Sequence, residues 1–339
     1  MKQPYSIGFL VALILSFSSL TGCEKTYVID TYATMRYDVL ALPAPATATD
    51  LLAVVFPSAS GGLVGGAGGT VYATADGGKT WINRSQASLG QVRKLRSGGP
   101  ATVWAATSVG LFRTVDAGQS WQRAQYANFG GVVGPAFDVQ FVTTQIGYAV
   151  GENGNIWKTT NGGQTWTDLL TVAQRRFSLR AVSFTSPDSG QVVGAEYARY
   201  LTTNGGSTWS LVSGGSGEYR DVLCYGPGRY LLASDKEGFS DNPASGIAGA
   251  RTIDDNLNWP IYALARHGER GGPMVAVGEK TIIRHDPTFS LRPESTPWTN
   301  VHAPSGASFT ATFKGAAFAD ARTLYTVGTN GALYRFYYQ

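Results

Sequence analysis

The chain has 339 residues with 43 Gly, 12% aromatic and only 15% charged residues, and its net charge is +4. Many glycines and aromatics with few charges favour short strands joined by tight turns over a helical protein. The small positive excess does not by itself indicate nucleic-acid binding.

The first 22 residues have the pattern of a signal peptide. Lys2 precedes an apolar run, Ile7–Leu15, that is too short to be a convincing membrane span and is typical of a signal. The letters LTGC at residues 20–23 resemble the lipobox of bacterial lipoproteins. This resemblance implies cleavage before Cys23 and acyl chains that anchor the protein firmly. An ordinary secretory signal with a chance cysteine is the alternative. We expect a signal peptide over 1–22, a lipid-anchored tether over 23–34 and an outer-membrane lipoprotein of the cell envelope.

One eight-residue pattern recurs along the rest of the chain, with the form Ser/Thr-x-Asp/Asn-x-Gly-x-Ser/Thr-Trp. It is spelled TADGGKTW at 74–81, TVDAGQSW at 114–121, TTNGGQTW at 159–166 and TTNGGSTW at 202–209, with a worn copy, TIDDNLNW, at 252–259. A period of roughly 40–50 residues that is rich in strand formers indicates the blades of a β-propeller.

The residues around each copy divide into four short strands. In Ala136–Leu169 these are DVQF, GYAVG, NIWKTT and QTWTDL, and the same frame fits Leu179–Val212. We therefore predict an all-β, seven-bladed propeller of four-stranded antiparallel blades over residues 35–339. The last blade lacks an outer strand, and we expect Met35–Leu42 to supply it and close the ring. The predicted innermost strands are Leu51–Phe56, Val92–Ser97, Ala136–Phe141, Leu179–Phe184, Tyr219–Cys224, Ile261–Arg266 and Phe313–Phe318.

The repeated pattern lies between the third and fourth strands of each blade, where a hairpin turn is expected. An Asp or Asn side chain can accept backbone N–H bonds, a Gly permits positive φ, and the Trp can pack between blades. The pattern resembles the Asp-box, or bacterial neuraminidase repeat, and this resemblance implies a structural role away from any active site. The residues concerned are Asp76, Trp81, Asp116, Trp121, Asn161, Trp166, Asn204, Trp209, Asp254 and Trp259.

Signals of catalysis are weak in this sequence. The chain has no Arg-Ile-Pro motif of the sialidase type and no recurring pair of carboxylates. His267, His285 and His302 show no metal-ligand spacing, and we interpret them as solvated loop residues. Cys224 sits in the apolar segment DVLCY and is expected to be an inert core thiol. We expect no enzyme, no catalytic residue, no cofactor and no metal; a sialidase-like propeller that binds or hydrolyses glycans is the alternative.

One set of residues stands out when the seven innermost strands are aligned. Symmetry places the second residue of each strand around the mouth of a central channel, and most of these are cationic or aromatic. One interpretation is a site that grips an anionic or polar partner, since Arg suits carboxylates. The other is an internal ring of Arg–Glu pairs. The residues are Leu52, Arg93, Phe137, Arg180, Arg220, Tyr262 and Lys314, joined on the same face by Arg175 and Arg176 and by the acids Glu152, Glu196, Asp235 and Glu279.

The repeat unit, with its innermost Arg and its GxxGxIxxTxNGGxTW stretch, resembles the photosystem II stability/assembly factor family of seven-bladed propellers. The likeness runs from about Asp50 to the C-terminus and is strongest over the third and fourth repeats. It implies a non-enzymatic chaperone for a reaction-centre subunit, with an Arg-rich patch near the channel. Arg180 and Arg220 match the family's Arg at this position, and Arg93 is a further match. Leu52, Phe137 and Tyr262 depart from it. We expect a monomer that binds a protein or anionic ligand, binds no nucleic acid, and meets the membrane through its lipid.

Overall fold

A computed structural model describes residues 35–43, 49–99, 101–126, 133–170, 176–212, 216–236, 239–242, 251–252, 260–268, 272–285, 298–301 and 309–338. All of them belong to the compact unit Ala33–Gln339. The predicted signal peptide, the lipobox with Cys23 and the tether lie outside the described residues. Within the described ranges, no helix is both long and apolar enough to cross a membrane.

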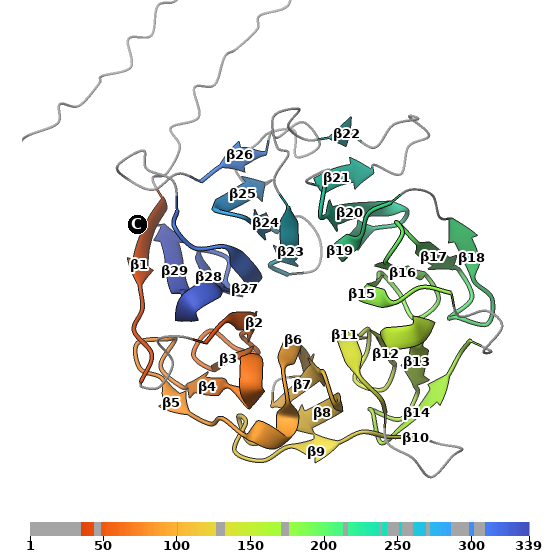
Figure 1. Cartoon of the computed structure of the whole chain (residues 1–339), viewed down its shortest axis with the longest axis horizontal. Coiled ribbons are helices and arrows are strands. Elements are labelled where there is room, and N and C mark those ends of the chain that lie inside the picture. Colours follow the sequence, from red (N-terminus) through yellow and green to blue (C-terminus); the bar gives the residue numbers. More distant parts are fainter. Residues whose placement is uncertain are drawn as a thin grey trace, which may run out of the picture. The chain divides into compact units, whose positions relative to one another are not determined.

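The described strands form seven sheets, arranged as blades around a central axis (Figure 1). Each blade begins at its innermost strand and continues outward along the chain. Every innermost strand starts at the residue that the repeat frame predicts. From blade one to blade seven these strands are β2 (Leu51–Val55), β6 (Val92–Gly99), β11 (Ala136–Phe141), β15 (Leu179–Phe184), β19 (Tyr219–Gly226), β23 (Ile261–Arg266) and β27 (Phe313–Asp320).

The remaining strands extend each blade toward the rim. In blades one to three these are β3 (Gly62–Gly66), β4 (Val71–Thr74), β5 (Ile82–Asn83), β7 (Thr102–Thr107), β8 (Gly110–Thr114), β9 (Gln122–Arg123), β12 (Gly147–Gly151), β13 (Ile156–Thr159) and β14 (Thr165–Asp168). In blades four to six they are β16 (Gly190–Gly194), β17 (Arg199–Thr202), β18 (Ser210–Val212), β20 (Arg229–Ser234), β21 (Phe239–Asn242), β22 (Arg251–Thr252), β24 (Met274–Gly278), β25 (Thr281–His285) and β26 (Thr299–Asn300). Blade seven contains β28 (Thr323–Gly328) and β29 (Leu333–Tyr338).

The expectation that every blade is four-stranded and antiparallel is wrong. Only six of the described sheets are of that kind, and the sheet of blade three has five strands. Its extra strand, β10 (Gln125–Tyr126), follows β9 of blade two along the chain and pairs in parallel with β14. The outer edge of β14 offers unpaired backbone groups, and the chain leaving blade two binds them.

The prediction of ring closure by an N-terminal strand is confirmed. β1 (Met35–Val39) pairs antiparallel with the C-terminal strand β29, in the register Met35↔Tyr338 and Val39↔Tyr334. Tyr37 of β1 packs against the aromatic rings of Phe309 and Phe336, with centroids 5.7 and 5.5 Å away. Blade seven is thus built from both ends of the propeller, and closure covers the edge of β29.

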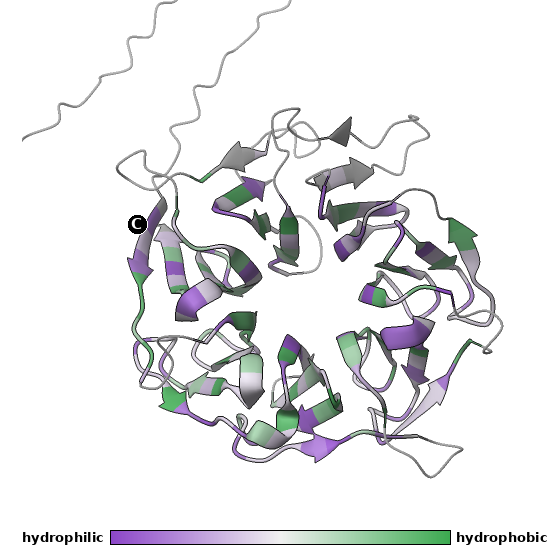
Figure 2. Ribbon diagram, viewed as in Figure 1, coloured by the Kyte–Doolittle hydropathy of each residue, from purple (hydrophilic) through white to green (hydrophobic). Residues whose placement is uncertain are grey.

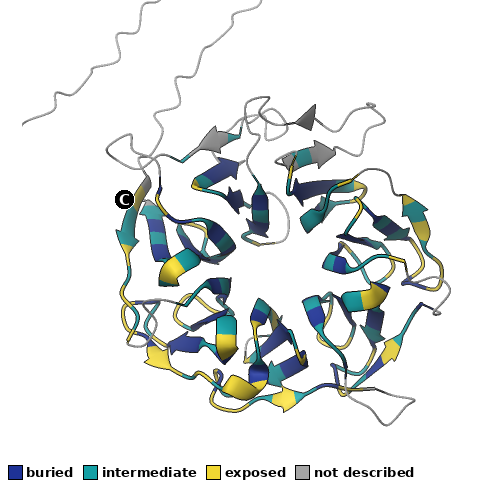
Figure 3. Cartoon of the chain, viewed as in Figure 1, coloured by how far each residue is buried: buried dark blue, intermediate teal, exposed yellow. Residues whose placement is uncertain are grey.

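The hydrophobic core lies between the blades. Figure 2 shows apolar residues along the inner and middle strands, and Figure 3 shows that burial decreases toward the rim. In one such layer Trp104 of blade two meets Phe141 and Trp166 of blade three, with centroids 5.2 and 5.5 Å away. Gly147 begins the next strand, and the absence of a side chain makes room for Phe141, since a Cβ there would lie 3.0 Å from its ring.

The Asp-box forms the predicted hairpin turn. Asp76 Oδ1 accepts hydrogen bonds from Thr74 Oγ1 (2.8 Å) and from the Thr80 backbone N–H (2.9 Å), and Thr80 Oγ1 donates to Oδ2 at 2.6 Å. Gly78, at φ 76°, donates its N–H to Thr74 Oγ1 at 2.9 Å. These bonds, those from Thr80 first, lower the pKa of Asp76 to about 2. The box side chains are occupied with their own turn, and Trp81 packs beside Tyr325 of blade seven. The fifth box, with Asp254 and Trp259, lies outside the described residues.

Candidate functional site

Each residue predicted at the channel mouth is the extra residue of a β-bulge. In all seven innermost strands the pairing register jumps over this one position, for example from Val92 to Lys94 across Arg93. A bulge leaves its residue unpaired and turns its side chain away from the regular alternation. The seven residues form a set that we call the axial ring: Leu52, Arg93, Phe137, Arg180, Arg220, Tyr262 and Lys314.

The first part of the axial ring is a cation–aromatic–cation sandwich. The guanidinium carbons of Arg93 and Arg180 each lie 4.0 Å from the centroid of Phe137. Arg93 also donates to the Ala136 carbonyl (3.2 Å) and forms an ion pair with Glu152 (2.9 Å). Phe137, which departs from the Arg expected by family resemblance, therefore holds two arginines in place through its π faces.

Glu218 is a residue of the site that the sequence did not reveal. Its carboxylate forms ion pairs with both Arg180 and Arg220, the latter at 2.6 Å. Its backbone N–H donates to Asp235 Oδ1 at 2.9 Å, which fixes the loop. Its position two residues before Arg220 could have indicated it, because a side chain at that position faces the same mouth of the central channel.

The second part of the axial ring repeats the sandwich with different spacing. Lys314 Nζ lies 3.3 Å from the centroid of Tyr262, and the Arg220 guanidinium carbon lies 6.0 Å from it. No carboxylate of the described residues is within ion-pair distance of Lys314. Burial and then the charge of Arg220 lower the pKa of Lys314, while the more distant Asp50 and Glu279 act in the opposite direction.

The other residues predicted for this face are not gathered into the axial ring. Arg176 is exposed, and Arg175 lies outside the described residues. Glu196 is exposed in a turn with φ 55°. Among the acids predicted for this face, Glu152 pairs with a ring cation. Three arginines of the axial ring are thus paired internally, as the second interpretation of the sequence expects, whereas Lys314 has no ion pair among the described residues. Binding of a partner at this ring stays a prediction.

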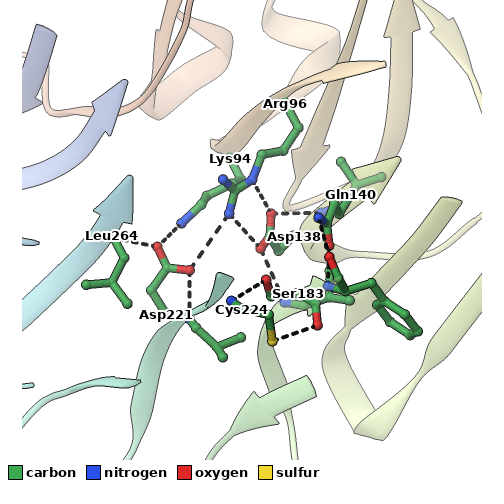
Figure 4. A network of polar contacts seen from close by, with 12 residues as sticks. Lys94, Arg96, Asp138, Gln140, Ser183, Asp221, Cys224 and Leu264 are labelled. Atoms are coloured by element: carbon green, nitrogen blue, oxygen red, sulfur yellow. Dashed lines mark hydrogen bonds and ion pairs between the residues drawn. The ribbon is translucent and has the colours of Figure 1, made fainter. Parts of the chain in front are cut away.

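Below the axial ring, a charged network that sequence reasoning missed crosses the axis (Figure 4). Lys94 Nζ bonds Asp221 Oδ2 at 2.7 Å, and Arg96 bonds both Asp138 oxygens at 3.0 and 3.1 Å. Arg96 also lies 3.8 Å from Asp221. Both carboxylates are 0% exposed. Burial acts to lower the pKa of Arg96, but Asp138 and Asp221 outweigh it and raise this pKa above its ordinary value.

The same carboxylates satisfy backbone groups of the neighbouring blades. Asp138 accepts from the N–H of Val182 in blade four (3.3 Å), and Asp221 accepts from the N–H of Leu264 in blade six (2.9 Å). Gln140 likewise accepts the Phe184 N–H at 2.7 Å and donates to the Phe184 carbonyl at 3.2 Å. Because innermost strands of adjacent blades do not pair directly, these side chains supply the missing hydrogen bonds.

The remaining candidates for chemistry are placed as follows. Cys224 is buried, and burial raises the pKa of its thiol, as expected for an inert core residue. The interpretation of the histidines as solvated loop residues is wrong for His285, which ends β25 and is 9% exposed. His267 is half-buried beside Phe318, and His302 lies outside the described residues. Within the described part of the chain, no group of three or more His, Cys, Asp or Glu could hold a metal ion.

Comparison with known proteins adds to this geometry. A family model described as "Photosynthesis system II assembly factor YCF48" matches residues 132–217, which include strands β11 to β18 of blades three and four. This chain is a propeller similar to the photosystem II assembly factors. No curated protein matches it in sequence.

Solved structures match the fold over most of the chain. "YCF48 bound to D1 peptide" has a TM-score of 0.67 and 16% identity, covering 89% of this chain and 97% of that one. "YCF48 from Cyanidioschyzon merolae" has 0.63 and 18%, covering 89% and 98%. The WD40 propeller domain of Doa1 has 0.62 and 11%, covering 89% and 97%. At these identities, the structural likeness establishes the fold.

Proposed function

We propose that this protein is a non-enzymatic, lipid-anchored propeller that binds a protein segment or another anionic ligand on its axial ring, as an assembly factor or scaffold does. The observation that carries the proposal is the balance of charge at the ring. Among the described residues, the four cations Arg93, Arg180, Arg220 and Lys314 have two ion-paired carboxylates, those of Glu152 and Glu218. A similar propeller is described as YCF48 bound to D1 peptide, which supports a protein partner.

The state of the buried carboxylates near the axis, Asp138 and Asp221, favours binding of a ligand over its hydrolysis. A glycosidase needs two carboxyl groups that are free to exchange protons with the substrate and water. Asp138 and Asp221 are each held by Arg96 or Lys94 and by backbone N–H groups, with no exposed surface. Such fully bonded carboxylates suit a structural role.

A crosslinked pull-down from envelope extracts tests the proposal. The wild type is compared with an Arg93→Glu/Arg180→Glu/Arg220→Glu variant. A matched control, Arg36→Glu/Lys79→Glu/Arg322→Glu, reverses three exposed charges outside the axial ring. All three proteins must first show the same thermal unfolding. We expect the wild type and the control to capture one common partner and the ring variant to lose it; capture of that partner by the ring variant would contradict the proposal.

The lipid anchor is tested separately. Replacing Cys23 with Ser removes the sulfur that would carry the diacylglycerol, so we expect the protein to leave the membrane fraction and its mass to lack acyl chains. Fractionation followed by mass spectrometry of the N-terminal peptide measures both. An unmodified wild-type Cys23 would rule the anchor out.

A further inference from the structure

Each innermost strand turns one backbone N–H toward the central axis, two residues after its axial-ring residue. This residue has the same place in the pairing register of every blade, as Val139↔Ala149 shows for blade three. In blades three to six the N–H at this place is bonded by an aspartate side chain, so it takes no part in the ladder with the second strand. We call the seven residues the inner-edge residues: Val54, Leu95, Val139, Val182, Val222, Leu264 and Ala316.

Two aspartates accept hydrogen bonds from four of these N–H groups (Figure 4). Asp138 accepts from Val139 of its own blade at 2.9 Å and from Val182 of the next blade at 3.3 Å. Asp221 does the same for blades five and six, at 2.9 Å in both bonds. Each aspartate directly follows its axial-ring residue, so one acceptor at this place satisfies two inner-edge N–H groups.

The N–H groups of Val54, Leu95 and Ala316 have no such acceptor among the described residues. Their pairing register is the same as that of the other four, so they also point away from the second strand. A buried N–H that lacks a partner costs free energy, and this cost favours an acceptor that comes from outside the chain. The residues that correspond to the two aspartates in blades one, six and seven have no acceptor in their side chains: Ala53, Ala263 and Gly315.

A cavity lies where these three N–H groups converge. Val54, Leu95 and Ala316 line it together with Lys94 and Arg96, and about 20 Å³ of it is open to the centre of a water-sized group. This is room for one water molecule or one small ion. Lys94 and Arg96 have more N–H groups than their bonds to aspartates occupy, so the cavity is rich in hydrogen-bond donors.

The charge of the channel favours an anion over water in this cavity. Among the described residues, six cations of the axial ring and the charged network have four carboxylates as ion-pair partners, which leaves an excess of positive charge. Opposite charges interact more strongly in a buried site than in water. The cations are Arg93, Arg180, Arg220, Lys314, Lys94 and Arg96, and the carboxylates are Glu152, Glu218, Asp138 and Asp221.

We propose that the central channel binds one small monovalent anion, of the size of chloride, between the N–H groups of Val54, Leu95 and Ala316 and the side chains of Lys94 and Arg96. The ion does for blades seven, one and two what the two aspartates do for blades three to six. It is a structural ion inside the channel, and it does not depend on the proposed binding of a partner at the axial ring.

The test replaces the ion with a side chain. Ala53→Asp places a carboxylate directly after the axial-ring residue of blade one. By the pattern of the two natural aspartates, this carboxylate accepts from the N–H groups of Val54 and Leu95. The variant therefore carries its own anion in the cavity and should no longer need one from solution.

Ala181→Asp is the matched control. Ala181 has the same place in blade four, and it is as buried as Ala53, at 0% against 2% exposed. The N–H groups that a carboxylate there would reach, those of Val182 and Val222, are already bonded. This variant should be less stable than wild type and should keep the wild-type response to chloride.

Thermal unfolding is measured in mixtures of sodium chloride and sodium gluconate at constant ionic strength, because gluconate is too large for the cavity. For the wild type we expect the melting temperature to rise by about 2 °C for each tenfold increase in chloride above its Kd. For Ala53→Asp we expect no dependence on chloride.

Crystals grown in sodium bromide locate the ion by its anomalous scattering. We expect one bromide within hydrogen-bond distance of the Val54 and Leu95 N–H groups in the wild type and none there in Ala53→Asp. A cavity without an anomalous signal, or an unchanged chloride response in Ala53→Asp, would overturn the inference. The bromide position decides the matter even if Ala181→Asp does not fold, and the pull-down of a partner is unaffected by either result.

Discussion

At the scale of single residues, the four described Asp-boxes allow Asp and Asn to be compared at the same position of the turn. Asp76 and Asp116 accept hydrogen bonds with both carboxylate oxygens, while Asn161 and Asn204 accept with one oxygen and donate the amide to Thr165 and Thr208. The turn is the same in all four, so the charge is dispensable to its geometry. What differs is the response to acid, because only the carboxylates titrate.

We predict that the Asp76→Asn/Asp116→Asn variant is as stable as wild type at neutral pH and less sensitive to acid. The pKa of each aspartate is lowered to about 2 in the folded chain, and is about 4 when unfolded. The stabilisation of the fold by the two ionised carboxylates is therefore complete above about pH 5, and it is lost as the pH falls toward 2. Thermal unfolding measured from pH 2 to pH 7 should show a shallower acid decline for the variant. Parallel declines would contradict the assignment.

The sandwich around Phe137 gives a second prediction at this scale. Phe137→Leu keeps an apolar side chain but removes both π faces, and we expect it to lower the free energy of unfolding by about 1–2 kcal/mol. Phe137→Tyr retains the faces and should stay close to wild type. Urea unfolding of the two variants compares them; an equal loss in both would show that packing, not the cations, sets the stability at this position.

At the scale of secondary-structure elements, the sequence predicted the strands well because the repeat fixes them. The start of every innermost strand, the Asp-box turn and the closing strand β1 all follow from one motif and its spacing. The parallel strand β10 could not be predicted, since it belongs to no repeat and depends on the free edge of β14. The Lys94, Arg96, Asp138 and Asp221 network was also missed, because its partners are in blades two, three and five, far apart in sequence.

The closing strand yields a prediction of its own. Deletion of residues 1–43, which removes β1, should lower the melting temperature and promote association of the protein, because the edge of β29 becomes free to pair with another chain. Deletion of residues 1–34 alone keeps β1 and is the control. Light scattering after size-exclusion chromatography, with thermal unfolding, distinguishes them; a monomeric, equally stable longer deletion would show that β1 is not required for closure.

At the scale of the whole molecule, the charged network of Lys94, Arg96, Asp138 and Asp221 links blades that are not neighbours. Lys94 of blade two reaches Asp221 of blade five, and Asp221 in turn bonds the backbone of blade six. Ring contacts between adjacent blades alone would let the propeller open at any one interface. A cross-axis link resists that opening from the centre.

We predict that Asp221→Asn destabilises the propeller by about 3–5 kcal/mol, because it leaves buried cations without their carboxylate. Asp235→Asn is the control, since Asp235 is half-buried and accepts one backbone N–H from Glu218. The free energy of unfolding in urea measures both. A loss under 1 kcal/mol for Asp221→Asn would mean that the network contributes little to holding the blades together.

The direction of β1 decides how the propeller is presented. Val39 pairs beside the start of β29, near the axial-ring face, and Met35 pairs with Tyr338 at the far end, where the Asp-box hairpins lie. A tether that holds the chain by its N-terminus, whether a lipid or an affinity tag on a sensor chip, therefore joins it on the Asp-box side. The axial ring lies on the opposite side of the propeller from that attachment point, so attachment there leaves it accessible to a partner.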